Sequence, residues 1–189
     1  MDTQKPIALV TGATSGIGEA CARRLHGAGY RVIITGRNTE KLQALIEEFG
    51  DDSLPLVFDV RNREAAEAAI DSLPAEWQEI EVLVNNAGLA LGLEKEYEGD
   101  FRDWDTMIDT NIKGLLYMTR AIVPGMVERG KGHVINIGSV AGDAAYANGN
   151  VYCGTKAAVK AITDGLRIDL AETPIRVTLL KPGLVETCF

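Results

Sequence analysis

Tyr152 and Lys156 stand four residues apart in the stretch NVYCGTKAAVKAI, whose pattern is that of the start of a helix. Side chains at positions i and i+4 share one face of a helix and lie ~5–6 Å apart. A free phenol loses its proton only near pH ~10, and a neighbouring ammonium favours its ionised form. The spacing therefore suits a general acid–base pair, although a core tyrosine beside a solvated surface lysine would show the same spacing.

A second candidate site is the glycine-containing stretch TGATSGIG at residues 11–18, with Gly12, Gly16 and Gly18 between a strand and a helix. A tight turn needs residues that tolerate positive φ. Bare backbone also lets a pyrophosphate approach the positive N-terminal end of the following helix. The spacing is Gly-x-x-x-Gly-x-Gly, so it indicates a dinucleotide site, with an ordinary strand-to-helix turn as the alternative.

The end of the second strand bears on which dinucleotide is bound. NAD-binding folds usually place an acid there for the adenosine ribose, but this chain reads TGRN at residues 35–38. The Arg37 guanidinium suits a 2′-phosphate and is expected to face no nearby carboxylate competitor. Asp59 could accept a hydrogen bond from an adenine amino group. The alternatives are a solvated surface arginine and an aspartate that caps a turn or helix.

The elements that must position these residues alternate along the chain. Strands are predicted at residues 7–10, 31–36, 54–60, 80–86, 132–139 and 175–183. Helices are predicted from residue 16 to an end near Gly27 and Gly29, at 39–50, 63–73 and about 101–128, and around Tyr152 and Lys156. Pro124 is expected to end or bend the fourth helix, and residues 89–100 to form a loop. Near-continuous apolar strands indicate a sheet covered on both faces. The prediction is an α/β fold, a doubly wound parallel sheet (Rossmann fold) in three layers, forming a single domain over residues 1–189.

Composition excludes several function classes. The net charge is −8 and the pI about 4.8, which argues against nucleic acid or an anionic membrane as a partner. No apolar run approaches the ~20 residues of a membrane span. The three cysteines, Cys21, Cys153 and Cys188, lack metal-type spacing, and their odd number favours a reducing, cytoplasmic location. With His26 and His133 far apart, no metal site is expected.

Together the motifs resemble one family. TGATSGIG, NNAG at 85–88, Asn111, Ser139, Tyr152-x-x-x-Lys156 and Pro182-Gly183 occur in the order found in short-chain dehydrogenases/reductases, and the resemblance covers essentially the whole chain. The stretches LPAEWQEIEVLVNNAGLALG and GLVET are similar, more narrowly, to NADP-dependent 3-hydroxy acid dehydrogenases that oxidise serine and L-allo-threonine. The resemblance implies hydride transfer between NADP(H) and a small hydroxy acid or carbonyl substrate.

The resemblance also implies roles for individual residues. Tyr152 is the general acid–base, and Lys156 holds the nicotinamide ribose and tunes Tyr152. Ser139 and Tyr152 bind the substrate oxygen, and Asn111 anchors a water that relays protons from Lys156. Each role has a structural alternative: Ser139 could only cap a helix, Asn111 could bond a backbone group, and Asn85 could tie neighbouring strands together.

The same resemblance gives a set of cofactor-binding residues and an assembly. The cofactor set is Gly12, Thr14, Ser15, Gly16, Ile17, Gly18, Arg37, Asn38, Asp59, Val60, Asn86, Ala87, Gly88, Tyr152, Lys156, Pro182, Gly183, Val185 and Thr187. A homodimer or homotetramer is implied, built on the long helices, although Ala157, Ala158 and Ala161 would equally suit core packing.

The sequence ends at Phe189, whereas the resemblance implies a further C-terminal strand and a lid over the active site, so we expect either a truncated chain or a sequence that omits a part. A chain ending there is expected to bind NADP weakly, to turn over poorly and to associate through its open sheet edge. Two other functions stay open at this point. One is a 3-oxoacyl-type or broad-specificity carbonyl reductase, and the other is a catalytically silent NADP-binding fragment or scaffold.

Overall fold

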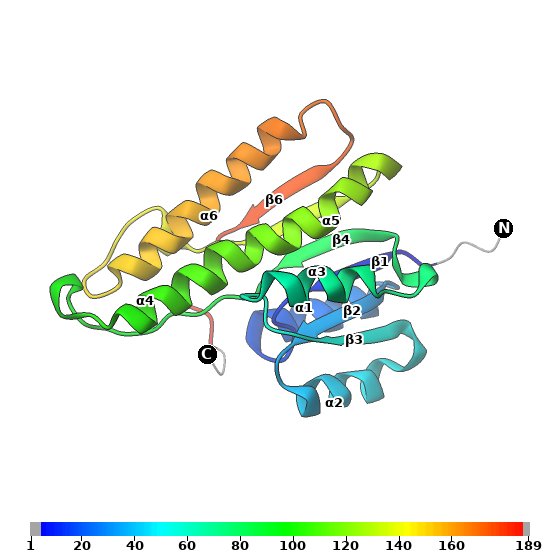
Figure 1. Ribbon diagram of the computed structural model, residues 1–189, viewed down its shortest axis with the longest axis horizontal. Coiled ribbons are helices and arrows are strands. Elements are labelled where there is room, and N and C mark those ends of the chain that lie inside the picture. The colour runs from blue at the N-terminus through cyan, green and yellow to red at the C-terminus, as the bar shows by residue number, and fades with distance from the viewer. Residues whose placement is uncertain (1–4, 187–189) are drawn as a thin grey trace.

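The computed structural model describes residues 5–186 and contains one sheet of six parallel strands in the order β3-β2-β1-β4-β5-β6. The strands are β1 Ile7–Val10, β2 Arg31–Gly36, β3 Ser53–Val57, β4 Ile80–Asn85, β5 His133–Ile137 and β6 Arg176–Leu180. The helices are α1 Gly16–Gly27, α2 Thr39–Phe49, α3 Arg63–Asp71, α4 Phe101–Ile108, α5 Leu115–Arg129 and α6 Asn150–Asp169. The doubly wound parallel sheet predicted from the sequence is confirmed (Figure 1).

Successive residues of a strand point to opposite faces of the sheet, and each face has its own core. On one face Leu9 of β1 packs in a cluster with Met118 and Met126 of α5, whereas on the other face Val10 packs with Leu42 of α2. All five side chains are almost completely buried. The central strands therefore carry apolar residues on both faces, which explains their near-continuous apolar runs.

The edge strands do not follow this rule. Val57 of β3 is 55% exposed and Leu180 of β6 is 45% exposed, so the expectation that all strands are covered on both faces was wrong at the two edges. The open edge also accommodates Pro55 in β3, because an edge strand loses little when one residue lacks a backbone donor.

β3 is shorter than predicted, because residues 58–60 leave the sheet. The last contact with β2 is the bond from Phe58 N–H to the Gly36 carbonyl (3.2 Å). Oδ1 of Asp59 then accepts from the backbone N–H of Arg61 (3.0 Å), which turns the chain away. Asp59 and Val60 therefore lie in a turn beyond the strand.

α4 and α5 form one long helical element (Figure 1). Of the two expected effects of Pro124, an end or a local bend, the end does not occur, because α5 continues through Pro124 to Arg129. The irregularity lies earlier, where residues Asp109–Gly114 form a π-helical turn that carries Asn111. Such turns change the direction of side chains locally and are frequent at functional sites.

None of the helices among residues 5–186 combines the length and the apolar character that crossing a membrane requires. Within the same residues, no group of three His, Cys, Asp or Glu side chains is placed so that it could hold a metal ion.

Candidate active site

A large cleft of about 870 Å³ lies at the carboxyl ends of the strands, where the strand order reverses between β1 and β4. This is the position at which open α/β sheets bind ligands. Most of the predicted site residues line it: Gly12, Thr14, Ser15, Gly16, Ile17, Arg37, Asp59, Val60, Asn86, Ala87, Gly88, Ser139, Tyr152, Lys156, Pro182, Gly183 and Val185. Gly18, Asn38 and Asn111 lie outside this lining, and Thr187 is outside the described residues.

The loop after β1 has the backbone that the glycines predicted. Gly12 and Gly16 have φ values of 64° and 54°, in the region that favours glycine. Gly18 has another reason: a Cβ there would lie 2.2 Å from the Gly12 carbonyl oxygen. The loop is tied to the end of β4, because Nδ2 of Asn86 donates to the carbonyls of Thr11 (2.9 Å) and Gly12 (3.1 Å).

Lys156 and Tyr152 lie at the opposite side of the cleft, on the first turns of α6. Lys156 is only 6% exposed, and its Nζ donates to the Ile137 carbonyl (3.0 Å) and lies 5.8 Å from the centre of the Tyr152 ring. The alternative of a solvated surface lysine is therefore wrong. Tyr152 is half-buried and faces the cleft rather than the core.

Burial lowers the pKa of Lys156 from its ordinary value of 10.5 to about 8. Between these two values the unfolded chain binds a proton at Lys156 that the folded chain does not. The Lys156 contribution to the free energy of unfolding should therefore rise by about 3 kcal/mol as the pH increases from 8 to 10.5.

This pH dependence is measurable by denaturant unfolding of the cofactor-free chain and of Lys156→Met across that pH range. The stability difference between the two proteins is expected to shift in favour of the unmodified chain as pH rises. Parallel stability curves would show that the Lys156 ammonium is not penalised by its burial.

Ser139 ends the segment after β5 and caps the short turn that follows. Its Oγ accepts from the Ala141 backbone N–H (3.1 Å), so the capping alternative describes one real contact. The same residue also lines the cleft together with Tyr152 and Lys156. The structure therefore brings three of the four predicted catalytic side chains to the same cleft, and Asn111 lies outside its lining.

Asn111 bonds a backbone group, as its alternative interpretation stated. Oδ1 accepts from the Leu89 N–H (2.8 Å), and Nδ2 donates to the Leu89 carbonyl (2.9 Å) and to Oγ1 of Thr155 (3.0 Å). A Cβ at Gly88 would meet both Asn111 Oδ1 (3.2 Å) and Lys156 Nζ (3.4 Å). Asn111 thus holds the chain after β4 against α6, close to the buried ammonium.

A buried polar network behind the cleft was only partly predicted. Nδ2 of Asn85 donates to Oδ1 of Asn136 (2.9 Å) and to Oγ1 of Thr119 (3.0 Å), which confirms that Asn85 ties β4 to β5. Nδ2 of Asn136 donates to Oγ1 of Thr163 on α6 (2.9 Å). The signal in the sequence was an asparagine inside the apolar strand HVINI, since a buried amide needs partners.

The adenosine end of the cleft differs from the prediction at Arg37. This side chain is 65% exposed, but its Nη1 lies 3.7 Å from Oδ2 of Asp59, so a carboxylate competitor is present. The two meet because β2 and β3 are neighbours whose ends adjoin. Asn38 has a structural task, since its Oδ1 caps α2 by accepting from Lys41 N–H (2.9 Å). Sequence reasoning missed Arg61, which binds Asp59 through its side chain.

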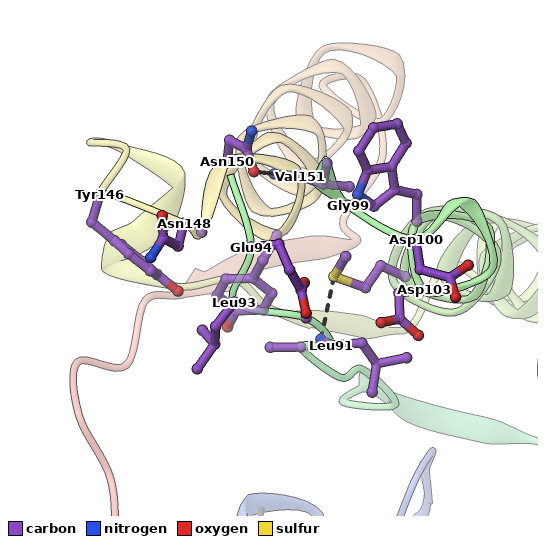
Figure 2. Close-up of a pocket in the computed structure, with 16 residues that line it drawn as sticks. Leu91, Leu93, Glu94, Gly99, Asp100, Asp103, Tyr146, Asn148, Asn150 and Val151 are labelled. Atoms are coloured by element: carbon purple, nitrogen blue, oxygen red, sulfur yellow. Dashed lines mark hydrogen bonds between the residues drawn. The ribbon is translucent and has the colours of Figure 1, made fainter. Parts of the chain in front are cut away.

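A narrow recess of about 30 Å³ adjoins the cleft at Tyr152. Figure 2 shows the side chains around it, where Leu91 N–H donates to Sδ of Met107 (3.4 Å). The recess is bordered by Glu94 and by Tyr146, which also lines the main cleft. The segment 89–100, predicted only as a loop, therefore borders Tyr152.

Comparison with known proteins places the chain among relatives of similar sequence. The family described as short chain dehydrogenase matches residues 6–189. The chain is 59% identical over 179 residues to the NADP-dependent 3-hydroxy acid dehydrogenase YdfG of Salmonella typhi, a match that covers 95% of this chain and 72% of that protein. It is 48% identical over 181 residues to serine 3-dehydrogenase of Rhizobium radiobacter, covering 96% and 72%.

Solved structures give the same result. The closed form of a serine dehydrogenase complexed with NADP⁺ superimposes with a TM-score of 0.95 at 57% identity, covering 97% of this chain and 74% of that one. Serine dehydrogenase from Escherichia coli superimposes with a TM-score of 0.93, also at 57% identity, covering 95% and 83%.

Proposed function

The chain belongs to the short-chain dehydrogenase family, and on this premise we propose that it is an NADP-dependent oxidoreductase acting on the hydroxyl of small 3-hydroxy acids. Serine and L-allo-threonine are the substrates that we favour. The observation that carries the proposal is the buried Lys156 ammonium beside Tyr152 at the cleft. Relatives at 48–59% identity that bear the names of such dehydrogenases support the substrate class and the cofactor.

The cleft fits NADP by observations on its own residues. Gly12 and Gly16 adopt backbone that leaves the loop after β1 open toward a pyrophosphate, and the N-terminus of α1 follows directly. Arg37 lines the cleft with a largely exposed guanidinium that suits a 2′-phosphate. We assign the remaining predicted cofactor residues of the cleft to the same ligand, within one dinucleotide-binding and catalytic domain.

The chemistry follows from the positions of four side chains. NADP⁺, when bound, supplies the acceptor for the hydride of the substrate CH–OH group. Tyr152 removes the hydroxyl proton as general base, and Ser139 hydrogen-bonds the same oxygen. Lys156 holds the nicotinamide ribose hydroxyls, and its charge favours the phenolate of Tyr152. Asn111, fixed by Leu89 and Thr155, anchors a water that passes the proton onward.

Absorbance at the reduced-nicotinamide band tests this function directly. The chain is expected to reduce NADP⁺ with serine, L-allo-threonine or 3-hydroxypropionate as substrate. Turnover of 3-oxoacyl compounds alone would favour a reductase of that class. Binding of NADP without turnover of any of these compounds would favour a silent cofactor-binding protein.

Arg37 gives a test of the cofactor. Arg37→Asp removes a charge-assisted partner of the 2′-phosphate and adds a repelling carboxylate, so the dissociation constant for NADP should rise about 30-fold or more. The dissociation constant for NAD, measured by calorimetry on the same variant, is the control and should change little. Equal affinities for NAD and NADP in the unmodified chain would contradict the assignment.

We further propose that the chain acts in the cytoplasm as a homodimer or homotetramer, without a nucleic acid or membrane partner. The assembly rests on the family to which the chain belongs. Cys21 and Cys153 are free thiols, in keeping with a reducing compartment. The net charge of −8 opposes binding to phosphate backbones.

A further inference from the structure

Asp59 lies between two arginines at the adenosine end of the cleft. Arg37 approaches it with a single contact, Nη1 to Oδ2 at 3.7 Å, which is too long for a hydrogen bond. Arg61 makes a much closer contact, with Nη2 2.7 Å from Oδ2 and Nε 3.0–3.1 Å from both carboxylate oxygens. Asp59 is therefore paired with Arg61 rather than with Arg37.

The backbone reinforces this choice of partner. The Arg61 N–H donates to Oδ1 of Asp59 (3.0 Å), so the carboxylate is held by both the main chain and the side chain of one residue. Burial alone would raise the pKa of Asp59, but these bonds from Arg61 outweigh it and hold that pKa below its usual value. Asp59 thus remains a carboxylate with its oxygens engaged by Arg61.

Arg37 is more exposed than the other two members of this group of three charged side chains. Its side chain is 65% exposed, whereas those of Arg61 and Asp59 are 37% and 26% exposed. Arg37 and Asp59 both line the cleft, but Arg61 does not. Without Arg61, the Arg37 guanidinium would be the opposite charge left beside Asp59, and the two groups would need to approach by only about 0.5–1 Å to bond.

We propose that Arg61 is a specificity-determining residue that acts by position: it holds Asp59 so that the Arg37 guanidinium stays available for the 2′-phosphate of the cofactor. The inference rests on the proposed preference for NADP. Arg61 then sets the choice between NADP and NAD without touching either, because only NADP carries the group that competes with Asp59 for Arg37.

Calorimetric titration of the full chain with NADP and with NAD tests this role. Arg61→Gln is expected to reduce the ratio of NADP affinity to NAD affinity about tenfold, the scale of one charge-assisted bond at a partly exposed site. Arg61→Lys keeps the charge but cannot bind the carboxylate through two parallel hydrogen bonds, so it should reduce the affinity ratio less. Arg63→Gln is the matched control: Arg63 pairs with Glu64 outside the cleft, and the ratio should not change.

Arg61→Gln is also made in an Asp59→Asn variant. This pair shows whether Arg61 acts through Asp59 or binds the 2′-phosphate directly. If Arg61 acts through Asp59, Arg61→Gln should then leave the affinity ratio unchanged. An equal loss in both backgrounds would show that Arg61 binds the phosphate itself and would overturn the inference.

The outcome for the unmodified chain distinguishes this inference from the proposed function. An NADP preference that survives Arg61→Gln would contradict only the inference. An unmodified chain without any preference would contradict both, because Arg61 would then have no selectivity to protect. Thermal unfolding of each variant establishes that the change in ratio is measured on folded protein.

Discussion

Replacing Tyr152 with phenylalanine is expected to reduce kcat by ~10²–10⁴-fold, the usual cost of losing a general acid–base. Only the hydroxyl is removed, so the ring still packs on α6 and the walls of the cleft stay in place. Lys156 keeps its bond to the Ile137 carbonyl, which does not involve the phenol. The dissociation constant for NADP should therefore change by less than about threefold, within the range of a neutral substitution.

Single-turnover and calorimetric measurements separate these two effects. The matched control is Tyr97→Phe, which removes the same hydroxyl from a side chain that is 77% exposed and outside the cleft. The control should retain the full rate. If Tyr152→Phe also retained a near-normal rate, Tyr152 would be a structural residue and the general base would have to be sought elsewhere in the cleft.

The sequence predicted best what depends on local pattern. Apolar runs such as IALV predict buried strands because β1 is covered on both faces, and the spacing of Tyr152 and Lys156 predicts a shared helical face because helix geometry is regular. The backbone conformations of Gly12 and Gly16 were predicted for the same reason, since a turn that tight excludes most other residues.

What the sequence could not predict depends on which elements become neighbours. Arg37 and Asp59 are separated by a whole helix in the chain, and only the pairing of β2 with β3 brings them within 3.7 Å. The bond between Asn136 and Thr163 likewise requires α6 to pack on β5. The π-helical turn at Asp109–Gly114 was not predicted either, and it carries Asn111, whose bonds to Leu89 and Thr155 join segments that are distant in the chain.

The prediction that every strand is covered on both faces was wrong at the edge strands for a related reason. Val57 reads as a core residue in the run LPLVFDV, but β3 has a neighbour on one side only, and the side chain is exposed. Hydrophobicity reports that a segment suits a sheet, not where in the sheet it will lie. The position of a strand follows from topology, which is set by all crossovers together.

Gly18→Ala is expected to weaken NADP binding by two orders of magnitude or more, although Gly18 does not line the cleft. The added Cβ would lie 2.2 Å from the Gly12 carbonyl oxygen and 2.3 Å from Nδ2 of Asn86. These groups cannot yield independently, since Asn86 donates to that same carbonyl and fixes the loop to β4. The methyl group must therefore displace the loop that meets the pyrophosphate.

Gly27→Ala is the matched control for this substitution, in the same helix. A Cβ at Gly27 meets nothing within 4 Å, and alanine is favoured over glycine in a helix by up to ~1 kcal/mol. The control should bind NADP normally and unfold at the same or a slightly higher temperature, while Gly18→Ala should lose both affinity and thermal stability. Normal NADP affinity in Gly18→Ala would mean that the loop can shift without consequence, and the close approach of α1 to Gly12 would then have no part in holding the cofactor.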